Sequence, residues 1–263
     1  MNRFARLLFA LLGLAICQAR PSCASSYKVV PVRLSLSQGN SRTLLTLKNE
    51  SKETLRFQVT VSAWDQGSQD EMKLEPTEDI VLFPSVLSVA ANEERTLRVA
   101  SATRFDSVEK TYRILFEELP PLEDSDSQRQ SQVRILTRMS IPVFLEPARV
   151  VAESRVEATL ERGVLSFHLR NIGNVHTVVR EVRARGLGAA GETVFSRSFK
   201  GWYVLAGGSR TYRIEIPEED CRRAKRIALE VETDRHTLVE FLDPGSGACS
   251  SGGDSATRVM LSR

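Results

Sequence analysis

The chain has 263 residues, 41% of them hydrophobic and 26% charged, which suits one large or two ordinary globular domains. Its formal net charge of +3 comes from Arg3, Arg6 and Arg20, because without these three the 36 Lys and Arg become 33, equal to the 33 Asp and Glu. The rest of the chain is neutral overall, which gives no electrostatic reason to expect nucleic acid or an anionic membrane surface as a partner.

The first 24 residues have the layout of a Sec-type signal peptide. Basic residues precede an apolar run over 7–16, and a small-residue site ends at Ala24. This order predicts export with cleavage after Ala24, a cut after Ala19 being the weaker option. The run is shorter than the roughly 20 apolar residues that span a bilayer, so we expect no stable membrane insertion. Lipidation at Cys17 is an alternative interpretation, although Ile16 is a poor small residue before the cysteine.

Between residues 27 and 147, apolar residues recur at every second position rather than at helical spacing. The clearest case is the run 55–63, where five apolar side chains alternate with polar ones. Such alternation is typical of strands with one buried face. Turn signals separate the runs at 38–40, 48–51 and 91–93. The strands expected here, about seven, predict an immunoglobulin-like sandwich.

One segment near the end of this stretch differs from the rest. A strand over 112–120 ends at a proline pair, and the polar segment 123–132, which contains no apolar residue, is typical of a flexible loop. Apolar and polar residues then alternate from Val133 to Val143, a strand of about eleven residues or ~36 Å. A strand of this length is longer than the neighbouring sandwich requires.

The long strand has two interpretations. Its odd-numbered side chains either face the core of their own domain, or stay partly open and complete the sheet of another protein. In strand addition of the second kind, main-chain hydrogen bonds give affinity and alternate side-chain pockets give specificity. Pro142 fits both interpretations, because proline is tolerated at the edge of a sheet. The odd-numbered row consists of Val133, Ile135, Thr137, Met139 and Ile141.

The alternating pattern restarts after residue 147 and predicts a second sandwich. Its strands are expected at 164–169, 177–182, 193–199, 212–216, 227–231 and 238–241, and the one helix candidate is 218–226. The chain is therefore predicted to be all-β, with two immunoglobulin-like β-sandwich domains in tandem. We expect a signal peptide at 1–24, an N-terminal domain at 25–146, a C-terminal domain at 147–245 and a disordered Gly/Ser-rich tail at 246–263.

Two of the four cysteines belong to the signal peptide, which leaves Cys221 and Cys249. An even pair in an oxidising compartment favours a disulfide between them, with two unpaired thiols as the alternative. The bridge would close a loop of about 28 residues and anchor the Gly/Ser-rich tail.

No pattern in the sequence indicates catalysis. The three histidines, His168, His176 and His236, lack metal-ligand spacing to cysteines or carboxylates and are expected to be structural. The sequence has no nucleophile elbow, phosphate-binding glycine loop or zinc-protease helix. Trp64 and Trp202 are expected in the core or rim of a sandwich rather than in a sugar-binding platform. We therefore predict no enzyme, no cofactor and no metal.

The order of these features resembles the periplasmic pilus chaperones of the chaperone–usher pathway, the PapD-like family. The shared features are an export signal, a basic residue near the mature N-terminus, a Tyr…Glu-Leu-Pro strand end, the long alternating strand and a second sandwich. Leu-Glu-Pro-Thr at 74–77, Phe-Glu-Glu-Leu-Pro at 116–120 and Ser-Ile-Pro-Val-Phe at 140–144 are most similar to the archaic branch, which includes spore-coat-U-like and Csu-type systems. The resemblance covers nearly the whole mature chain and is strongest from Tyr27 to Ala148.

This resemblance implies a periplasmic chaperone that binds pilin or fimbrial subunits by donor-strand complementation and delivers them to an outer-membrane usher. The donor strand of the family falls on Val133, Ile135, Thr137 and Met139, with Ile141 continuing it. A free strand edge of this kind also leads us to expect a self-capping dimer. The alternative from another class is a secreted two-domain structural or adhesive surface component.

The resemblance also implies an anchor for the C-terminal carboxylate of the client. Arg33 takes the place of the first-strand arginine that binds this carboxylate in the family. At the place of the second anchor, a lysine in better-studied relatives, this chain has Pro142. Either Arg33 acts alone, or Arg138 or Arg113 supplies the second cation. A second departure is Glu146, which replaces a domain-bridging arginine, so the interdomain ion pairs of those relatives are expected to be reversed in sign or absent.

Overall fold

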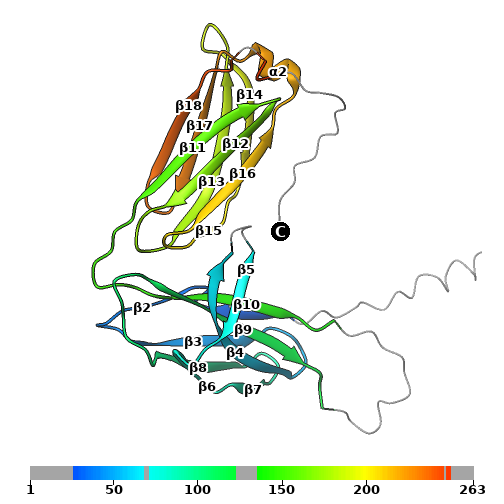
Figure 1. The fold of residues 1–263 in the computed structure, drawn as a ribbon. Coiled ribbons are helices and arrows are strands. Elements are labelled where there is room, and N and C mark those ends of the chain that lie inside the picture. The colour runs from blue at the N-terminus through cyan, green and yellow to red at the C-terminus, as the bar shows by residue number, and fades with distance from the viewer. Residues whose placement is uncertain (1–25, 68–70, 123–134, 246, 250–263) are drawn as a thin grey trace, which may run out of the picture.

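The computed structural model describes residues 26–67, 71–122, 135–245 and 247–249. The predicted signal peptide, the loop at 123–132, the donor residue Val133 and nearly all of the predicted tail lie outside this part. Within it, eighteen strands and one short helix form two β-sandwiches that meet at an angle (Figure 1). The predicted all-β class with two immunoglobulin-like sandwiches is confirmed.

The N-terminal sandwich consists of one sheet of four strands and one of six. The first has the order β1 (Tyr27–Val30), β3 (Arg42–Asn49), β8 (Glu94–Ser101) and β6 (Ile80–Phe83). The second has the order β2 (Leu34–Leu36), β10 (Arg138–Leu145), β9 (Lys110–Leu119), β4 (Leu55–Gln66) and β5 (Met72–Pro76), and β7 (Val86–Val89) also pairs with β4. The strand pairs are antiparallel except for β2 and β10, which are parallel.

The alternating side chains of β4 and β9 face the core between the two sheets, as predicted. Phe57 of β4 and Ile114 and Phe116 of β9 are completely buried, in one cluster with Leu45 and Leu97 of the opposite sheet. Complete burial of a large apolar side chain contributes about 1.5–3 kcal/mol. This shared core therefore holds the two sheets of the N-terminal sandwich together.

The last strand of this sandwich, β10, begins later than the sequence predicts. It starts at Arg138, and residues 135–137 before it are not in strand conformation. The alternation of side chains is kept, because Ile141 and Val143 face the core opposite residues of β9. At its other end the strand continues to Leu145, two residues beyond the predicted end.

The C-terminal sandwich consists of one sheet of three strands and one of five. The first has the order β11 (Ser154–Glu161), β12 (Val164–Asn171) and β16 (Ser209–Glu215). The second has the order β14 (Thr193–Phe199), β13 (Thr177–Leu187), β17 (Arg226–Thr233) and β18 (Thr237–Leu242), and β15 (Tyr203–Val204) also pairs with β13. All six strands predicted for this half are present. The sequence pattern missed β11, an edge strand whose apolar residues are only half-buried, and β15, which is too short to show a period.

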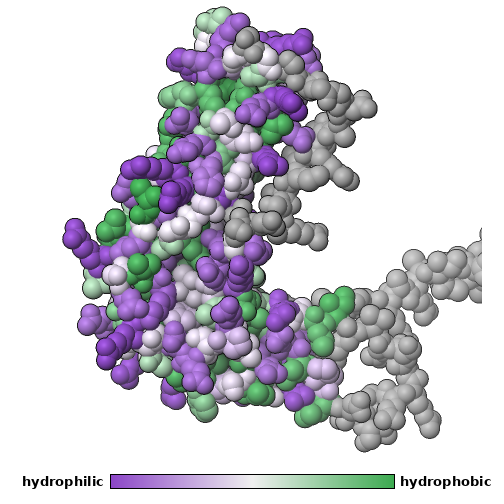
Figure 2. All heavy atoms as spheres, in the orientation of Figure 1, coloured by the Kyte–Doolittle hydropathy of each residue, from purple (hydrophilic) through white to green (hydrophobic). Residues whose placement is uncertain are grey.

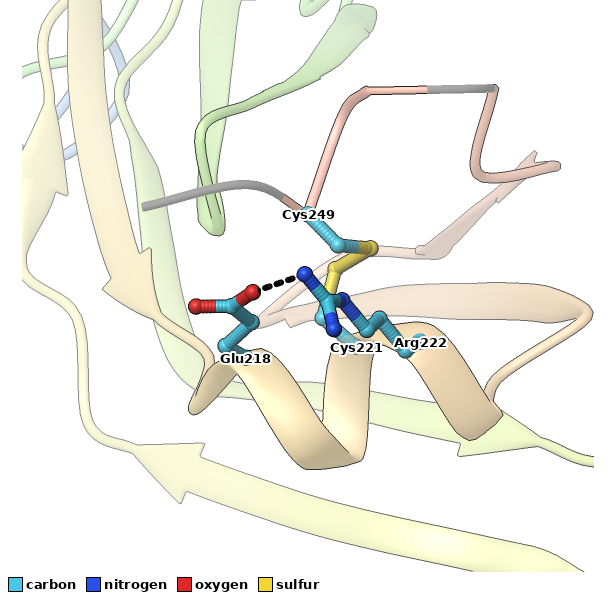
Figure 3. Close-up of a disulfide and its surroundings, with 4 residues drawn as sticks. All are labelled: Glu218, Cys221, Arg222 and Cys249. Carbon is cyan, nitrogen blue, oxygen red and sulfur yellow. Dashed lines mark ion pairs between the residues drawn. A yellow bond between two sulfur atoms is a disulfide. The ribbon is translucent and has the colours of Figure 1, made fainter. Parts of the chain in front are cut away.

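A short helix, α2 (Glu218–Arg223), carries one end of a disulfide (Figure 3). Cys221 on this helix is bonded to Cys249, which confirms the predicted bridge. Glu218 and Arg222 form an ion pair one turn apart on the same helix. The helix ends earlier than predicted because Ala224 is already extended.

No helix in the described ranges combines the length and the apolar composition that crossing a membrane requires.

Candidate functional site

The outer edge of β10 is open over most of its length. One edge of the strand pairs with β9 from Arg138 to Leu145, whereas the other edge pairs with β2 only from Val143 to Leu145. Within the part of the chain that the structure describes, no strand lies against this outer edge at residues 138–142. We call these residues the open edge. Their outward-facing main-chain groups are available to pair with an added strand.

The odd-numbered side chains at the start of β10 run from exposed to buried. Ile135 is 57% exposed, Thr137 and Met139 are half-buried, and Met139 packs against the margin of the core. Ile141 is only 2% exposed and belongs to the core of its own domain. Ile141 was expected to continue the donor row. It is instead buried, because the core of its own sandwich extends to this position.

Exposed apolar side chains gather where β9 ends and β10 begins. Leu122, three residues after β9, is 74% exposed, and Leu136, next to Ile135 and two residues before β10, is 42% exposed. Figure 2 shows hydrophobic atoms at this end of the N-terminal sandwich. An apolar group beside an unpaired strand edge is typical of a protein-binding surface.

Arg33 lies next to the open edge, immediately before β2. Leu34 pairs with Val143, so Arg33 comes one position earlier, at the level of Pro142. Its side chain is exposed, and with the residues that the structure describes it forms no ion pair and no hydrogen bond. A guanidinium in this position has its donor groups free for a carboxylate, which it can bind through two parallel hydrogen bonds.

Arg113 lies directly opposite Pro142 on β9 but is enclosed by aromatic rings. It is 5% exposed, and its guanidinium carbon lies 3.9 Å from the ring centre of Trp64 and 5.4 Å from that of Trp202. Burial lowers the pKa of Arg113, and the nearby Tyr203 opposes this shift only in part. Nε and Nη2 are buried and have no hydrogen-bond partner, so the ring faces supply the main compensation for the lost water.

Arg138, the third predicted anchor, lies at the far end of the open edge. Its Nε is 3.1 Å from a carboxylate oxygen of Glu117 on β9, and both side chains are exposed. It is four positions from Pro142, ~13 Å along an extended strand. Of the three predicted cations, Arg33 is therefore the one that is both exposed and next to Pro142.

The two sandwiches meet through a cluster of apolar and aromatic side chains. Trp64 of β4, Phe144 of β10 and Leu205 are buried together, and Trp202 and Tyr203 pack against them. The two tryptophans, expected in the core or rim of one sandwich, thus lie between the two. Strand β10 itself runs from the open edge into this interface, because Phe144 lies near its C-terminal end.

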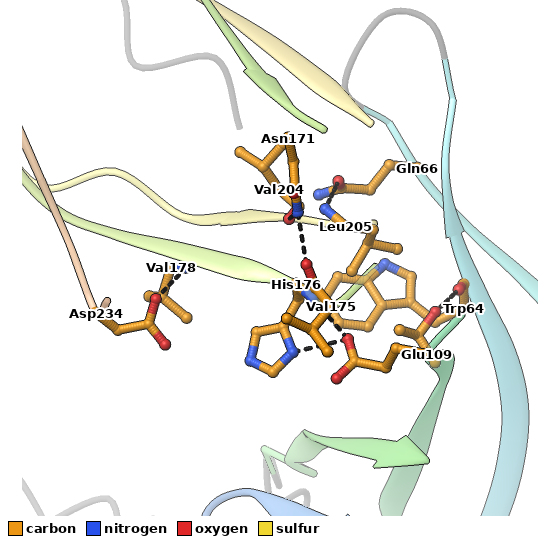
Figure 4. A network of polar contacts seen from close by, with 11 residues as sticks. Trp64, Gln66, Glu109, Asn171, Val175, His176, Val178, Val204, Leu205 and Asp234 are labelled. Atoms are coloured by element: carbon orange, nitrogen blue, oxygen red, sulfur yellow. Dashed lines mark hydrogen bonds and ion pairs between the residues drawn. The ribbon is translucent and has the colours of Figure 1, made fainter. Parts of the chain in front are cut away.

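A buried polar pair, Glu109 and His176, crosses the same interface (Figure 4). Oε2 of Glu109 accepts hydrogen bonds from the main-chain N–H of His176 and from its ring Nδ1, each at 2.8 Å. The imidazole also stacks on Phe144, with 3.7 Å between the ring centres. Glu146, where the interdomain ion pairs of the relatives are expected to be reversed in sign or absent, makes no ion pair with any residue in the described ranges.

Two more side chains connect the sandwiches by hydrogen bonds. The side-chain amide of Asn174 donates to the main-chain oxygen of Ser107 at 2.7 Å. The Gln66 amide donates to the carbonyl of Tyr203 at 2.8 Å and accepts from the N–H of Leu205 at 2.9 Å (Figure 4). Sequence reasoning missed this network, because each pair of residues lies far apart in the chain and no local pattern links them.

Comparison with known proteins agrees with this architecture. Residues 26–151 match the family model described as pili and flagellar-assembly chaperone, PapD N-terminal domain. No curated protein matches the chain in sequence.

Three solved structures illustrate the likeness in fold. The CsuC–CsuE chaperone–tip adhesion subunit complex of Acinetobacter baumannii gives 18% identity over 82% of this chain and 97% of that chain, with a TM-score of 0.53. The SafB chaperone with the SafA pilin of Salmonella enterica gives 14% identity over 84% and 99%, with a TM-score of 0.55. The chaperone DraB of E. coli gives 17% identity over 85% and 98%, with a TM-score of 0.52. At such identities the comparison establishes the fold, which is the PapD-like arrangement of two immunoglobulin-like domains.

Proposed function

We propose that this protein is a periplasmic chaperone for pilus or fimbrial subunits, which lends a strand to an incomplete client and passes it to an outer-membrane usher. The family match of the N-terminal domain and the fold shared with pilus chaperones support this role. The observation that carries the proposal is the open edge of β10, with Ile135 exposed directly before it. The three sequence stretches named above support a place in the archaic branch of this family.

The client in this proposal is an exported sandwich that lacks one strand and exposes a groove in its core. The residues before and at the start of β10 fill that groove, and the open edge pairs with a strand of the client. Ile135 and Met139 enter pockets of the client on either side of Thr137, and Val133, outside the described residues, precedes them. A large apolar side chain that becomes completely buried contributes about 1.5–3 kcal/mol, so Ile135, the most exposed of the described row, contributes most. Thr137 is a weak position in this row, and Met139 is an adaptable one.

The C-terminal carboxylate of the client binds Arg33 in this scheme. Arg33 is exposed beside Pro142, whereas Arg113 is covered by rings and Arg138 is paired with Glu117. We therefore assign the anchor to Arg33 alone. Pro142, which replaces the second cation of better-studied relatives, leaves this role to a single guanidinium.

The cycle requires no nucleotide. Export delivers both proteins to the periplasm, and the usher receives the complex. The next subunit then displaces the chaperone's strand with a better-fitting one of its own. The open edge of one copy can also pair with a second copy, which would cap it until a client arrives.

A photo-reactive amino acid at position 135 tests the proposal. In cells that make the protein, it should crosslink in the periplasm to a small exported protein with a single incomplete sandwich, identified by mass spectrometry. The substitution Ile135→Asp should lower recovery of the same protein by about tenfold or more, because a carboxylate replaces the side chain that enters the client's pocket.

Val81→Asp is the matched control, because Val81 is similarly exposed, at 55%, but lies on β6 of the opposite sheet. It should leave recovery of the client unchanged. If Ile135→Asp and Val81→Asp recover the client equally well, with both variants folded, strand addition at β10 is wrong.

A further inference from the structure

Glu118 is a carboxylate on the face of β9 that otherwise forms the core. Tyr112, Ile114 and Phe116 alternate with it on this face, and Glu118 itself is 6% exposed. Phe57 of β4, which pairs with Glu118, is completely buried. Burying a carboxylate is costly unless hydrogen bonds replace the lost water, so its partners show what it does.

The carboxylate of Glu118 accepts two hydrogen bonds from Thr137. Oε2 accepts from the Thr137 amide at 3.1 Å and from the Thr137 hydroxyl at 2.8 Å. In the opposite direction, the main-chain N–H of Glu118 donates to the main-chain carbonyl of Thr137 at 3.0 Å. Two residues paired in this way in an antiparallel sheet normally exchange two main-chain hydrogen bonds. Here the Thr137 N–H donates to the side chain of Glu118 instead of to the Glu118 carbonyl. Strand β10 begins one residue later, at Arg138.

Tyr27 closes this contact from the opposite sheet. Its ring meets Phe57 edge-on at 4.8 Å between centres, and its phenol faces the Thr137 side chain. Burial raises the pKa of the Tyr27 phenol, the Thr137 side chain opposes the shift, and the charge of Glu118 adds to it. Three elements, β1, β9 and the residues before β10, therefore converge on Thr137. This is the point where the row changes from the buried Ile141 to the exposed Ile135.

We propose that Glu118 is a positioning residue for the donor strand: by holding Thr137 against its own domain, it fixes where β10 leaves the sandwich and points Ile135 outward. The inference rests on the proposed function. A strand that is already placed loses less conformational freedom on binding, and this favours association. Without the carboxylate, the residues before Arg138 have to be ordered by the client itself.

The test compares Glu118→Ala with Glu118→Gln, using the client identified by crosslinking at position 135, diluted from urea into the chaperone. In Glu118→Ala, hydrogen exchange of the Thr137 main-chain N–H should speed up by about tenfold, because one charge-assisted hydrogen bond is lost. The association rate should fall by about fivefold while the dissociation rate changes less than about twofold. Glu118→Gln should restore most of the association rate, because its amide oxygen still accepts from Thr137.

Glu117→Ala is the matched control, since it removes the neighbouring exposed carboxylate that pairs with Arg138. It should change neither rate. An unchanged association rate in Glu118→Ala, or a Gln variant as slow as the Ala variant, would overturn the inference.

A second substitution keeps the test decisive if Glu118→Ala does not fold. Thr137→Val keeps the shape of the side chain but removes the hydroxyl that donates to Glu118. We expect association to slow by about threefold, although valine is the more hydrophobic side chain. Faster association would overturn the inference. If Ile135→Asp loses the client while Glu118→Ala and Thr137→Val bind it at the normal rate, only the proposed role of Glu118 is wrong. If Ile135→Asp binds the client normally, the proposed function itself is wrong.

Discussion

Arg33 and Arg113 lie on the two sides of Pro142, but Arg33 is exposed and Arg113 is buried among aromatic rings. Arg33 is exposed, and a carboxylate that it binds through charge-assisted hydrogen bonds gains about 1.5–3 kcal/mol. Arg33→Ala should therefore weaken binding of the client by about tenfold or more. It should leave the free energy of unfolding within about 0.5 kcal/mol of the parent value. Titration with the purified client and urea unfolding measure the two quantities.

Arg113→Met serves as the contrasting variant. Methionine is long enough to keep contact with the tryptophan rings, and it removes two buried nitrogen atoms that have no hydrogen-bond partner. Replacing a buried charge by an apolar side chain of similar size is often neutral or stabilising, so we expect unchanged binding and no loss of stability. A client amidated at its C-terminus should bind the parent and Arg33→Ala equally weakly. If amidation still weakens binding to Arg33→Ala but not to Arg113→Met, the anchor is Arg113.

Tyr112 makes the stability of the N-terminal sandwich dependent on pH in the alkaline range. Burial raises the pKa of its phenol, and the hydrogen bond to Asp79 at 2.7 Å and the charges of Asp79 and Asp106 raise it further. Because the folded pKa lies above the unfolded value of about 10, the folded state keeps a proton that the unfolded state has lost. The stabilisation from this group is therefore complete below pH ~10 and is lost as the pH rises through the folded pKa.

The expected result is that the difference in unfolding free energy between the parent and Tyr112→Phe shrinks between about pH 8 and pH 11. Urea unfolding at the two pH values measures it, and comparison with the phenylalanine variant cancels the titration of the lysines and arginines. A difference that stays constant over this range would show that the Tyr112–Asp79 bond does not hold the phenolic proton.

At the scale of the elements, the period of the side chains predicted most strands but could not place the start of β10. The odd-numbered row has the same spacing whether it faces its own core, as Ile141 does, or points outward, as Ile135 does. What divides the row is the end of the sandwich, where the Glu118 carboxylate of β9 accepts hydrogen bonds from Thr137. A local pattern holds no information about such contacts.

The same limit explains which site residues the sequence could suggest. Arg33 is suggested by the resemblance to the chaperone family, and the structure places it beside the open edge. The contact of Glu109 with His176 joins residues 67 positions apart and exists only when two finished domains meet. Each of these side chains has an ordinary sequence neighbourhood, so no signal in the chain singles out the pair.

On the scale of the whole molecule, the strand with the open edge also contacts the C-terminal domain. The open edge occupies the start of β10, and Phe144 near its end stacks on His176 of the C-terminal sandwich. The open edge and part of the interdomain contact therefore belong to one continuous element. A change that loosens the interface should loosen the C-terminal end of that strand as well.

Glu109→Ala tests this coupling. The substitution leaves the main-chain N–H and the ring Nδ1 of His176 buried without their acceptor, at a cost of about 1–3 kcal/mol. Because this cost falls on the interface and on neither core, the domains should separate before either sandwich unfolds. We expect a broader distribution of distances between spin labels placed one in each domain, and two thermal transitions where the parent shows one. Asp243→Ala is the control, since it removes an exposed carboxylate that pairs with Arg226 of the same C-terminal domain. An unchanged distance distribution in Glu109→Ala would mean that the aromatic cluster around Trp64 and Leu205 fixes the angle without the buried pair.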